Sequence, residues 1–414
     1  MVRIGKGWCP LIINVYEVVG FLHTCSKITA MSNEKFHIAI SPFIIDDLRE
    51  RLGRARWPDE IENSGWAYGT NKEYLHELCT HWGHGFDWYE QQEYLNTFSH
   101  FRANVGGGFG IHFIHEKGRG SQRVPLLLIH GYPDSFVRFL KIIPLLTAEG
   151  FDVVVPSIPG FGFSDRPRQP GMNPAWIADL FAQLMTDELG YKQFIVHGGD
   201  WGSSIAEQLA IHHPELLSGI HLMDIPFHYL FTMRPEDLTQ AEKQYLQAGR
   251  EWQMTEGAYA MLQSTKPQTL AYAVNDSPIG LAGWIIEKFY AWSDISGQLE
   301  NSFTKDELLT NLTIYWVTQT AGSAFRLYYE TMRSMSMDKT SFQKINIPTA
   351  VAIFPRDMVP APRVFAERVF NVQQWTEMPG GGHFAAMEKP DLLAADIIRW
   401  VKKLEVPAQL ELQH

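Results

Sequence analysis

Three residues far apart in the chain have the types and the order of a nucleophile, an acid and a base: Asp200, Asp357 and His383. Asp200 lies in the sequence GGDWG, between an apolar run at 194–196 and a segment at 203–212 that favours a helix. Small residues around such a strand, turn and helix can hold a reactive side chain above the end of the strand. A carboxylate is ionised near neutral pH, so Asp200 could attack an electrophilic carbon directly and form an ester. The ordinary alternative is an Asp that only caps the following helix.

Turnover of such an ester needs water activated by a base and donors for the oxyanion that forms. His383 follows three glycines at 380–382 and precedes an expected C-terminal helix, which makes it the candidate base. Asp357 follows an apolar run and would hold the tautomer of His383, while Asp224 also follows an apolar run and competes for this role. The spacing to His383 favours Asp357. The chain order nucleophile, acid, base is that of α/β-hydrolases.

The loop HGYPDS at 130–135 comes where this fold supplies a second oxyanion donor. Gly131 allows a tight turn and Pro133 fixes it. We therefore expect the backbone N–H groups of Tyr132 and Trp201 to form the oxyanion hole. Taken alone, the loop would equally suit a plain connection between a strand and a helix.

Apolar runs alternate with segments that favour helices through the second part of the chain. The expected strands are 111–115, 125–129, 152–156, 194–196, 219–223, 348–354 and 371–377. The expected helices among them are 174–189, 203–212 and 391–403. This alternation predicts an α/β fold with a mostly parallel sheet, helices on both faces and the site at the carboxyl ends of the strands. Between Phe227 and Thr340 the pattern changes to long helices, expected at 239–254, 281–292 and 305–330, which predicts a helical cap over the site.

These patterns divide the chain into five segments. They are an N-terminal extension at 1–35, expected to be poorly ordered, a meander at 36–122 that wraps the core, two parts of the hydrolase core at 123–226 and 341–414, and the cap at 227–340. The meander has expected helices at 42–54, 72–82 and 87–95. Its glycine run at 106–110 precedes an expected strand, so we interpret it as a turn and not as a dinucleotide-binding loop.

The composition narrows the class of partner. The chain has 35 Lys and Arg against 46 Asp and Glu, and a net charge of −11 argues against nucleic acid or an anionic membrane surface as a partner. Its 3 cysteines are too few for a disulfide framework. The run His76, Cys79, His81 and His84 matches no usual zinc spacing. We expect neither a metal nor a cofactor.

Longer motifs resemble the microsomal type of epoxide hydrolases. They are HGYPDS, SIPGFGFSD, GGDWG, STKPQTLAYAVNDSPIGLAGWIIEKF and GGHFAAMEKPDLL, and the resemblance covers about residues 36–404. It implies a small apolar epoxide and water as reactants, Asp357 as the acid, and two cap tyrosines that donate to the epoxide oxygen. By motif these are Tyr259 and Tyr328. Tyr329 competes for the second role, because neighbours on a helix point about 100° apart.

The N-terminal segment does not qualify as the transmembrane anchor that animal members of this family carry. Residues 11–22 are largely apolar, but Asn14 and Glu17 interrupt them and the run is too short to span a bilayer. We expect a cytoplasmic protein, with weak membrane association through residues 1–30 and a homodimer left open.

The predicted reaction is the conversion of an epoxide and water to a vicinal diol through an ester on Asp200. One alternative is a haloalkane dehalogenase with the same nucleophile and Trp201 as a halide donor. Another is an idle hydrolase fold that serves as a binding protein. The paired tyrosines and the meander argue against the first, and the complete set of catalytic groups argues against the second.

Overall fold

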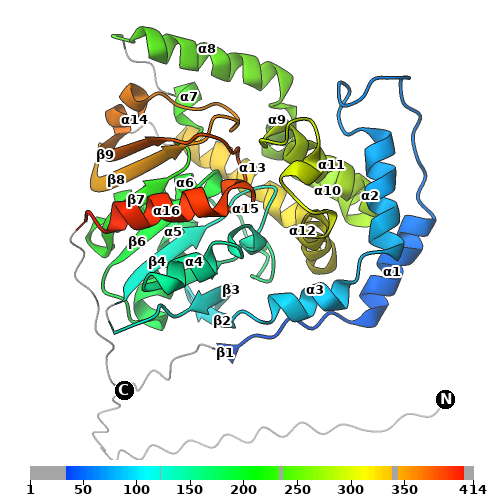
Figure 1. Ribbon diagram of the computed structural model, residues 1–414, viewed down its shortest axis with the longest axis horizontal. Helices are drawn as coiled ribbons and strands as arrows, with labels where there is room; N and C mark the ends of the chain where they lie inside the picture. The colour runs from blue at the N-terminus through cyan, green and yellow to red at the C-terminus, as the bar shows by residue number, and fades with distance from the viewer. Residues whose placement is uncertain (1–33, 122, 233–235, 338–343, 405–414) are drawn as a thin grey trace, which may run out of the picture. The chain divides into compact units, whose positions relative to one another are not determined.

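A nine-stranded sheet forms the centre of the protein, with the strand order β1-β2-β3-β5-β4-β6-β7-β8-β9 (Figure 1). The structure, a computed structural model, describes residues 34–121, 123–232, 236–337 and 344–404. Apart from the short strand β1, Glu34–Lys35, the expectations for residues 1–35 lie outside the described residues.

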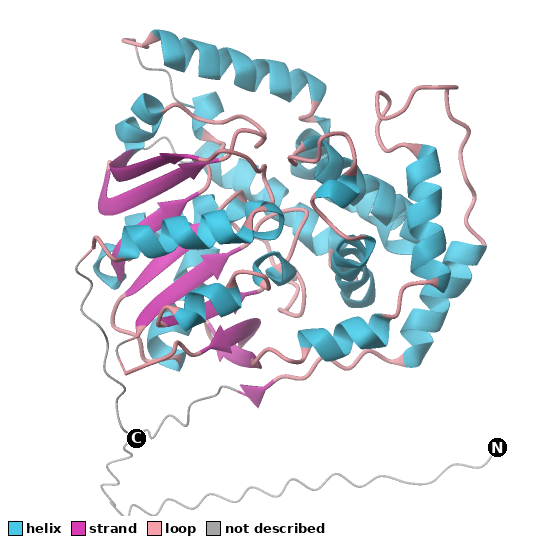
Figure 2. Ribbon diagram, in the orientation of Figure 1, coloured by secondary structure: helices cyan, strands magenta, loops and turns pink. Residues whose placement is uncertain are grey.

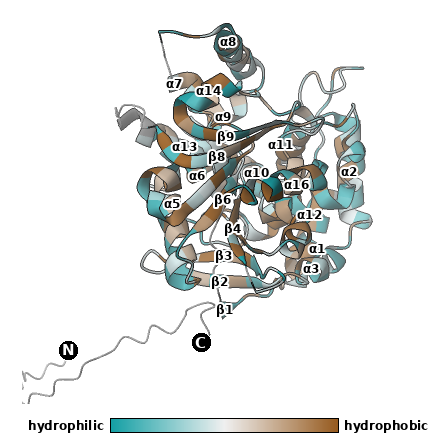
Figure 3. Ribbon diagram, turned by 60° about the vertical axis from the view of Figure 1, so that its left-hand side comes forward, coloured by the Kyte–Doolittle hydropathy of each residue, from teal (hydrophilic) through white to brown (hydrophobic). Residues whose placement is uncertain are grey.

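Six neighbouring strands of the sheet run parallel, which confirms the mostly parallel sheet. They are β4 (Val124–Ile129), β5 (Phe151–Pro156), β6 (Phe194–Gly198), β7 (Leu217–Leu222), β8 (Ile345–Ile353) and β9 (Phe370–Glu377). The sequences of the central strands β4, β5 and β6 are mostly apolar, as expected where helices cover both faces of a sheet, whereas the edge strand β9, FNVQQWTE, is largely polar. The central strands are accordingly coloured as hydrophobic in Figure 3.

An antiparallel hairpin extends the sheet on one side. It consists of β2 (His100–Val105) and β3 (Phe109–Glu116), and β3 also pairs antiparallel with β5. The glycine run is the hairpin turn, as expected, and Gly106, Gly107 and Gly108 have φ values of 55°, 82° and 119°. Strand β2 was not expected, because its sequence HFRANV mixes polar and apolar residues and is ordered by its pairing with β3.

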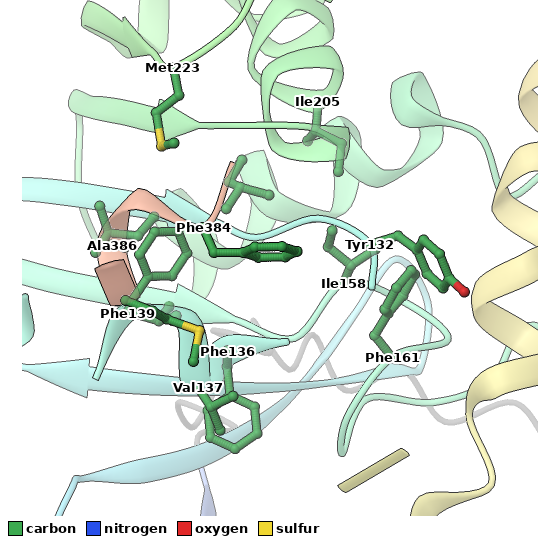
Figure 4. Packing of buried hydrophobic residues seen from close by; sticks show 14 of the residues in the cluster. Tyr132, Phe136, Val137, Phe139, Ile158, Phe161, Ile205, Met223, Phe384 and Ala386 are labelled. Atoms are coloured by element: carbon green, nitrogen blue, oxygen red, sulfur yellow. The ribbon is translucent and has the colours of Figure 1, made fainter. Parts of the chain in front are cut away.

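Helices cover both faces of the sheet (Figure 2). Those of the core are α4 (Ile143–Ala148), α5 (Pro174–Gln183), α6 (Trp201–His212), α14 (Arg363–Val369), α15 (Ala385–Glu388) and α16 (Pro390–Val401), with short 3-10 turns at Phe136–Phe139 and Pro214–Leu216. A further 3-10 turn, Leu299–Asn301, belongs to the cap segment. The helix expected at 174–189 is α5 followed by a single π-helical stretch, Leu184–Glu188. Figure 4 shows part of the buried core, which includes the rings of Phe136, Phe139 and Phe384.

The described part of the cap is entirely helical. Its helices are α7 (Tyr229–Thr232), α8 (Gln240–Thr255), α9 (Ala258–Thr265), α10 (Pro267–Asp276), α11 (Pro278–Ala291), α12 (Lys305–Thr318) and α13 (Ala321–Met337). The prediction of a single helix at 305–330 is wrong, because this segment forms two helices. Helix α12 ends where Gln319 adopts a left-handed conformation with a φ of 53°, and α13 begins two residues later. Residues 319 and 320, where the break occurs, are neither Gly nor Pro, and the nearest glycine, Gly322, already lies in the first turn of α13.

The helices of the meander are α1 (Pro42–Gly53), α2 (Lys72–His84) and α3 (Trp88–Leu95), close to the expected ranges. They contact the cap through side chains. The indole of Trp82 donates to Thr313 Oγ1 at 2.9 Å, and the rings of Trp66 and Tyr290 stack with their centres 3.8 Å apart. The meander therefore braces the cap helices as well as extending the sheet.

Candidate active site

The residue expected as the nucleophile, Asp200, lies in the sharp turn between β6 and α6 and has a φ of 57° and a ψ of −124°. This conformation is rare for a residue other than glycine and has to be held by its surroundings. The backbone N–H of Asp200 donates to Asp224 Oδ2 at 2.7 Å. A Cβ at Gly202 would come within 2.1 Å of the carbonyl oxygen of Ile129, so the turn can pack on β4 only with glycine there.

Both amides expected in the oxyanion hole reach the Asp200 carboxyl group. The backbone N–H of Tyr132 donates to Asp200 Oδ1 at 2.8 Å, and the backbone N–H of Trp201 hydrogen-bonds the same carboxyl group. A Cβ at Gly131 would lie 2.3 Å from Asp200 Oδ1, so glycine is required for this close approach. The loop after β4 therefore contacts the turn at 198–202, called the elbow below, through a hydrogen bond to its central residue.

The expected base and acid are paired. His383 Nδ1 and Asp357 Oδ1 are 2.8 Å apart, and His383 Nε2 lies 3.8 Å from Asp200 Oδ2. Asp224 contacts the elbow instead, through the backbone N–H of Asp200 and the hydroxyl of Ser203. The structure thus brings Asp357, and not Asp224, into hydrogen-bond contact with the imidazole.

Sequence reasoning missed Glu388, a buried residue that orders the loop of His383. Its carboxylate accepts hydrogen bonds from the backbone N–H groups of Gly382 at 3.0 Å, Phe384 at 2.9 Å and Asp294 at 2.8 Å. The backbone N–H of His383 in turn donates to the carbonyl of Trp292 at 2.8 Å. His383 is therefore held in place by hydrogen bonds of its two neighbours in the chain, Gly382 and Phe384, and by its own hydrogen bond to the end of α11. The only sign of Glu388 in the sequence was that an acidic residue follows His383 shortly afterwards.

A second missed residue is Arg138, which is buried beside the base. Its guanidinium lies 2.9 Å from Asp134 Oδ2 and donates to the carbonyl of His383. Asp134 also accepts from the backbone N–H of Gly131 at 3.1 Å. This buried ion pair connects the loop of the oxyanion donors to the loop of the base.

The charges in the site shift the pKa values of its groups in a consistent way. Burial lowers the pKa of His383, but the charge and the hydrogen bond of Asp357 outweigh it and raise the pKa to about 9. Burial raises the pKa of Asp200, and the charge of His383 and the amides of Tyr132 and Trp201 oppose this rise. At neutral pH the resting site accordingly favours the imidazolium form of His383, while the net effect on Asp200 is a raised pKa.

Asp224, like Asp200, is an aspartate with a raised pKa. Burial first, and then the charge of Asp357, raise the pKa of Asp224 to about 7, while Ser203 and the amide of Asp200 lower it. A carboxyl group with such a pKa is partly protonated at neutral pH. Asp224 thus carries only part of a negative charge near pH 7.

The two cap tyrosines face the elbow from α9 and α13. Tyr259 and Tyr328 are buried, their ring centres lie 5.9 Å apart, and their side chains share a hydrogen bond. The ring of Tyr328 meets that of Trp201 edge to face at 4.7 Å. The competitor Tyr329 points elsewhere, and its hydroxyl accepts from Arg333 at an exposed position at 3.0 Å. The structure places Tyr328, and not Tyr329, at the site.

Other clusters that the sequence drew attention to lie apart from this site. Cys79 is buried and burial raises its thiol pKa to about 12, while His81 Nε2 lies 2.7 Å from Asp306 Oδ1. Among the described residues, no three or more His, Cys, Asp or Glu side chains are grouped so as to hold a metal ion. Nor does any helix in the described ranges combine the length and the apolar character needed to cross a membrane.

Comparisons with known proteins agree with this geometry. Residues 33–139 match the family described as "Epoxide hydrolase N terminus", and residues 124–269 match the alpha/beta hydrolase fold. The chain is 37% identical to epoxide hydrolase 1 of the rabbit Oryctolagus cuniculus, with 89% of each chain covered. It is 34% identical to juvenile hormone epoxide hydrolase 1 of Ctenocephalides felis, over 91% of this chain and 87% of that one.

Solved structures show the same likeness. The juvenile hormone epoxide hydrolase of Bombyx mori superposes with a TM-score of 0.78 at 31% identity, covering 91% of this chain and 94% of that one. The epoxide hydrolase of Aspergillus niger gives a TM-score of 0.79 at 31% identity, covering 90% and 97%. With the matching N-terminal family and the shared fold, these likenesses show that the chain belongs to the microsomal-type epoxide hydrolases, enzymes of the α/β-hydrolase fold.

Proposed function

We propose that the protein converts a small apolar epoxide and water to a vicinal diol through a covalent ester on Asp200. The arrangement around its carboxylate carries this proposal: one oxygen accepts the Tyr132 amide at 2.8 Å, and the other lies 3.8 Å from His383 Nε2. The same carboxyl group thus has the surroundings of a nucleophile and, after attack, those of an ester about to be hydrolysed.

In the first half-reaction, Asp200 attacks a carbon of the epoxide and the bond from that carbon to the ring oxygen breaks. The electron pair of this bond moves to the oxygen, which takes a proton from Tyr259 or Tyr328. A positioned phenol lowers this barrier because it donates where negative charge develops. The product is a hydroxyalkyl ester, and solvent restores the proton of the tyrosine.

In the second half-reaction, His383 Nε2 removes a proton from water and the hydroxide adds to the carboxyl carbon of Asp200. The amides of Tyr132 and Trp201 stabilise the resulting oxyanion. When the intermediate collapses, the bond from the carboxyl carbon to the alkoxide breaks, and the alkoxide takes the proton from the His383 imidazolium and leaves as the diol. The Asp200 carboxyl group, which now holds an oxygen from water, loses its remaining proton to solvent and is a carboxylate again. Asp357 stabilises the imidazolium that forms in this step, as its short contact with Nδ1 supports.

The proposal is tested by incubating the purified protein with styrene oxide, bulkier epoxides and 1-chlorohexane, and by measuring diol and chloride together. We expect diol from the wild type and none from Asp200→Asn, which keeps the shape of the side chain but removes its charge. Chloride without diol would instead favour the dehalogenase, for which the indole N–H of Trp201, buried without a hydrogen-bond partner among the described residues, is a halide donor. Neither product with any substrate would favour a binding protein.

A further inference from the structure

A buried lysine of the cap lies against the ring of one of the two tyrosines. Lys288, near the end of α11, is 5% exposed, and its ammonium nitrogen is 4.8 Å from the ring centre of Tyr259. The same nitrogen is 5.5 Å from the ring centre of Trp292. An ammonium at these distances is attracted by the negative face of an aromatic ring, and more strongly where water is excluded.

Two carboxylates lie beside the ammonium group of this lysine. Lys288 Nζ lies 2.5 Å from Glu287 Oε2 and 3.6 Å from Glu256 Oε2. A buried ion pair contributes little stability compared with an apolar side chain of similar volume, because both charges lose their hydration. Fold stability is therefore a poor explanation for an ammonium at this position, and its contact with Tyr259 is a better one.

Tyr259 needs help to act as a proton donor. Burial raises the pKa of its hydroxyl most, and the charges of Asp200, Glu287 and Glu256 raise it further, while its hydrogen bond with Tyr328 lowers it. When Tyr259 gives up a proton, negative charge spreads from the phenol oxygen into the ring. A cation against the ring stabilises that charge.

We infer that Lys288 is a positioning residue that acts through Tyr259: its ammonium holds the ring and stabilises the negative charge that develops there during epoxide opening. The inference rests on the proposed function. In this step the O–H bond of Tyr259 breaks and a new O–H bond forms to the epoxide oxygen, while Asp200 bonds to the attacked carbon and the carbon to oxygen bond opens. The phenolate of Tyr259 is paired with the ammonium until solvent reprotonates it.

The inference predicts that Lys288 affects one half-reaction and only through one hydroxyl group. A double-mutant cycle tests this, with Lys288→Met made in the wild type and in Tyr259→Phe, and with ester formation and ester hydrolysis measured separately by rapid-quench single turnover of styrene oxide. Methionine keeps the unbranched stem and removes the charge. In the wild-type background we expect ester formation about tenfold slower, as a desolvated contact of this kind implies. In Tyr259→Phe, where Tyr328 remains as a donor, we expect a change below about twofold.

A structural role for Lys288 would give a different pattern. Equal slowing in both backgrounds, or equal slowing of ester formation and ester hydrolysis, would overturn the inference. If Lys288→Met does not fold, Lys288→Gln takes its place in the same cycle. Lys288→Arg keeps a cation over the ring, and it should restore ester formation to within about threefold of the wild-type rate.

Lys305→Met is the matched control. Lys305 is a partly buried cap lysine on α12 that lies close to Glu77 and within 3.9 Å of Glu300. No ring contact of its ammonium is found within the described ranges. Its loss should change ester formation by less than about twofold. A wild type that forms neither ester nor diol would contradict the proposed function itself, whereas normal ester formation in Lys288→Met would contradict only the role of the lysine.

Discussion

The backbone N–H of Asp200 donates to the carboxylate of Asp224 at 2.7 Å, so the second aspartate that follows a strand supports the elbow and does not orient the base. Asp224 lies directly after β7, and the hydroxyl of Ser203 on α6 donates to its other oxygen. The carboxylates of Asp224 and Asp357 therefore have different roles. One holds the strained turn, and the other, Asp357, holds the imidazole at 2.8 Å.

Removal of Asp224 should therefore act on the elbow. Asp224→Ala leaves the buried amide of Asp200 without its acceptor, which should lower the free energy of unfolding by about 1–3 kcal/mol. Ester formation should slow because the carboxylate of Asp200 is no longer held in place. Urea denaturation and single-turnover kinetics measure the two effects. A changed pH profile of ester hydrolysis with normal ester formation would contradict this role and point back to His383.

Asp357→Asn should act on the base. In the wild type, the charge of Asp357 helps to raise the pKa of His383 to about 9, so ester hydrolysis should rise with pH as the imidazole becomes neutral. Its inflection should lie at or below about 9, because esterified Asp200 no longer adds its charge. In Asp357→Asn the inflection should move to lower pH and the maximal rate should fall. Single-turnover hydrolysis of the ester, measured between pH 5 and pH 10, measures the inflection and the maximal rate. This range spans the ordinary pKa of histidine, 6.5, and the raised pKa of His383, about 9. An inflection that does not move would rule out Asp357 as the partner.

The same pair has a consequence for stability. The pKa of His383 is higher in the folded protein, about 9, than its ordinary value of 6.5, so the folded state binds the proton more tightly. The stability that this pair contributes should be fully present below about pH 6.5 and be lost as the pH rises through about 9. Thermal unfolding at several pH values should show this loss in the wild type and a smaller one in His383→Gln.

The two neighbouring tyrosines of α13 should differ sharply. Tyr328→Phe removes a buried hydroxyl that shares a hydrogen bond with Tyr259 and should slow ester formation by at least about tenfold, since a positioned acid contributes roughly 100-fold or more and Tyr259 remains. Tyr329→Phe removes an exposed contact with Arg333 and should stay within about twofold of the wild type. Stopped-flow measurement of ester formation separates the two. Equal effects of the two substitutions would contradict an arrangement in which α13 turns Tyr328 toward the site and Tyr329 toward solvent.

Glu388→Ala should disturb the loop of His383. It leaves three buried N–H groups without their acceptor, so we expect a loss of at least about 2 kcal/mol in the free energy of unfolding. Ester hydrolysis should slow more than ester formation, because the base moves while Asp200 stays in place. Glu367→Ala, on the surface of α14 and paired with Arg363, is the control and should change stability by less than about 1 kcal/mol. If Glu388→Ala is as stable as this control, the anchoring role is wrong.

The sequence predicted those parts of the site whose chemistry needs particular local residues. The glycines around Asp200 and the glycine run before His383 mark sharp turns, and the structure has both turns where they were expected. The central parallel strands were equally clear, because burial on both faces favours continuous apolar runs, whereas the edge strand β9 gave a weaker, largely polar signal.

Features that depend on distant contacts were not predictable. Strand β2 is polar enough to pass for a loop until β3 pairs with it, and the break between α12 and α13 occurs at Gln319, which carries no turn signal. Glu388 and Lys288 each owe their position to groups from other parts of the chain. Without coordinates, nothing in the sequence connects Lys288 with the ring of Tyr259.

The covalent ester on Asp200 is tested most directly by a single turnover in water labelled with ¹⁸O, with enzyme in excess over styrene oxide. Mass spectrometry of the peptide that contains Asp200, and of the diol, locates the label. The account predicts one ¹⁸O in the Asp200 carboxyl group and none in the diol, because water attacks the carboxyl carbon and the diol takes its new oxygen from the protein. Label in the diol with an unlabelled Asp200 would contradict it and would mean that water opens the epoxide directly.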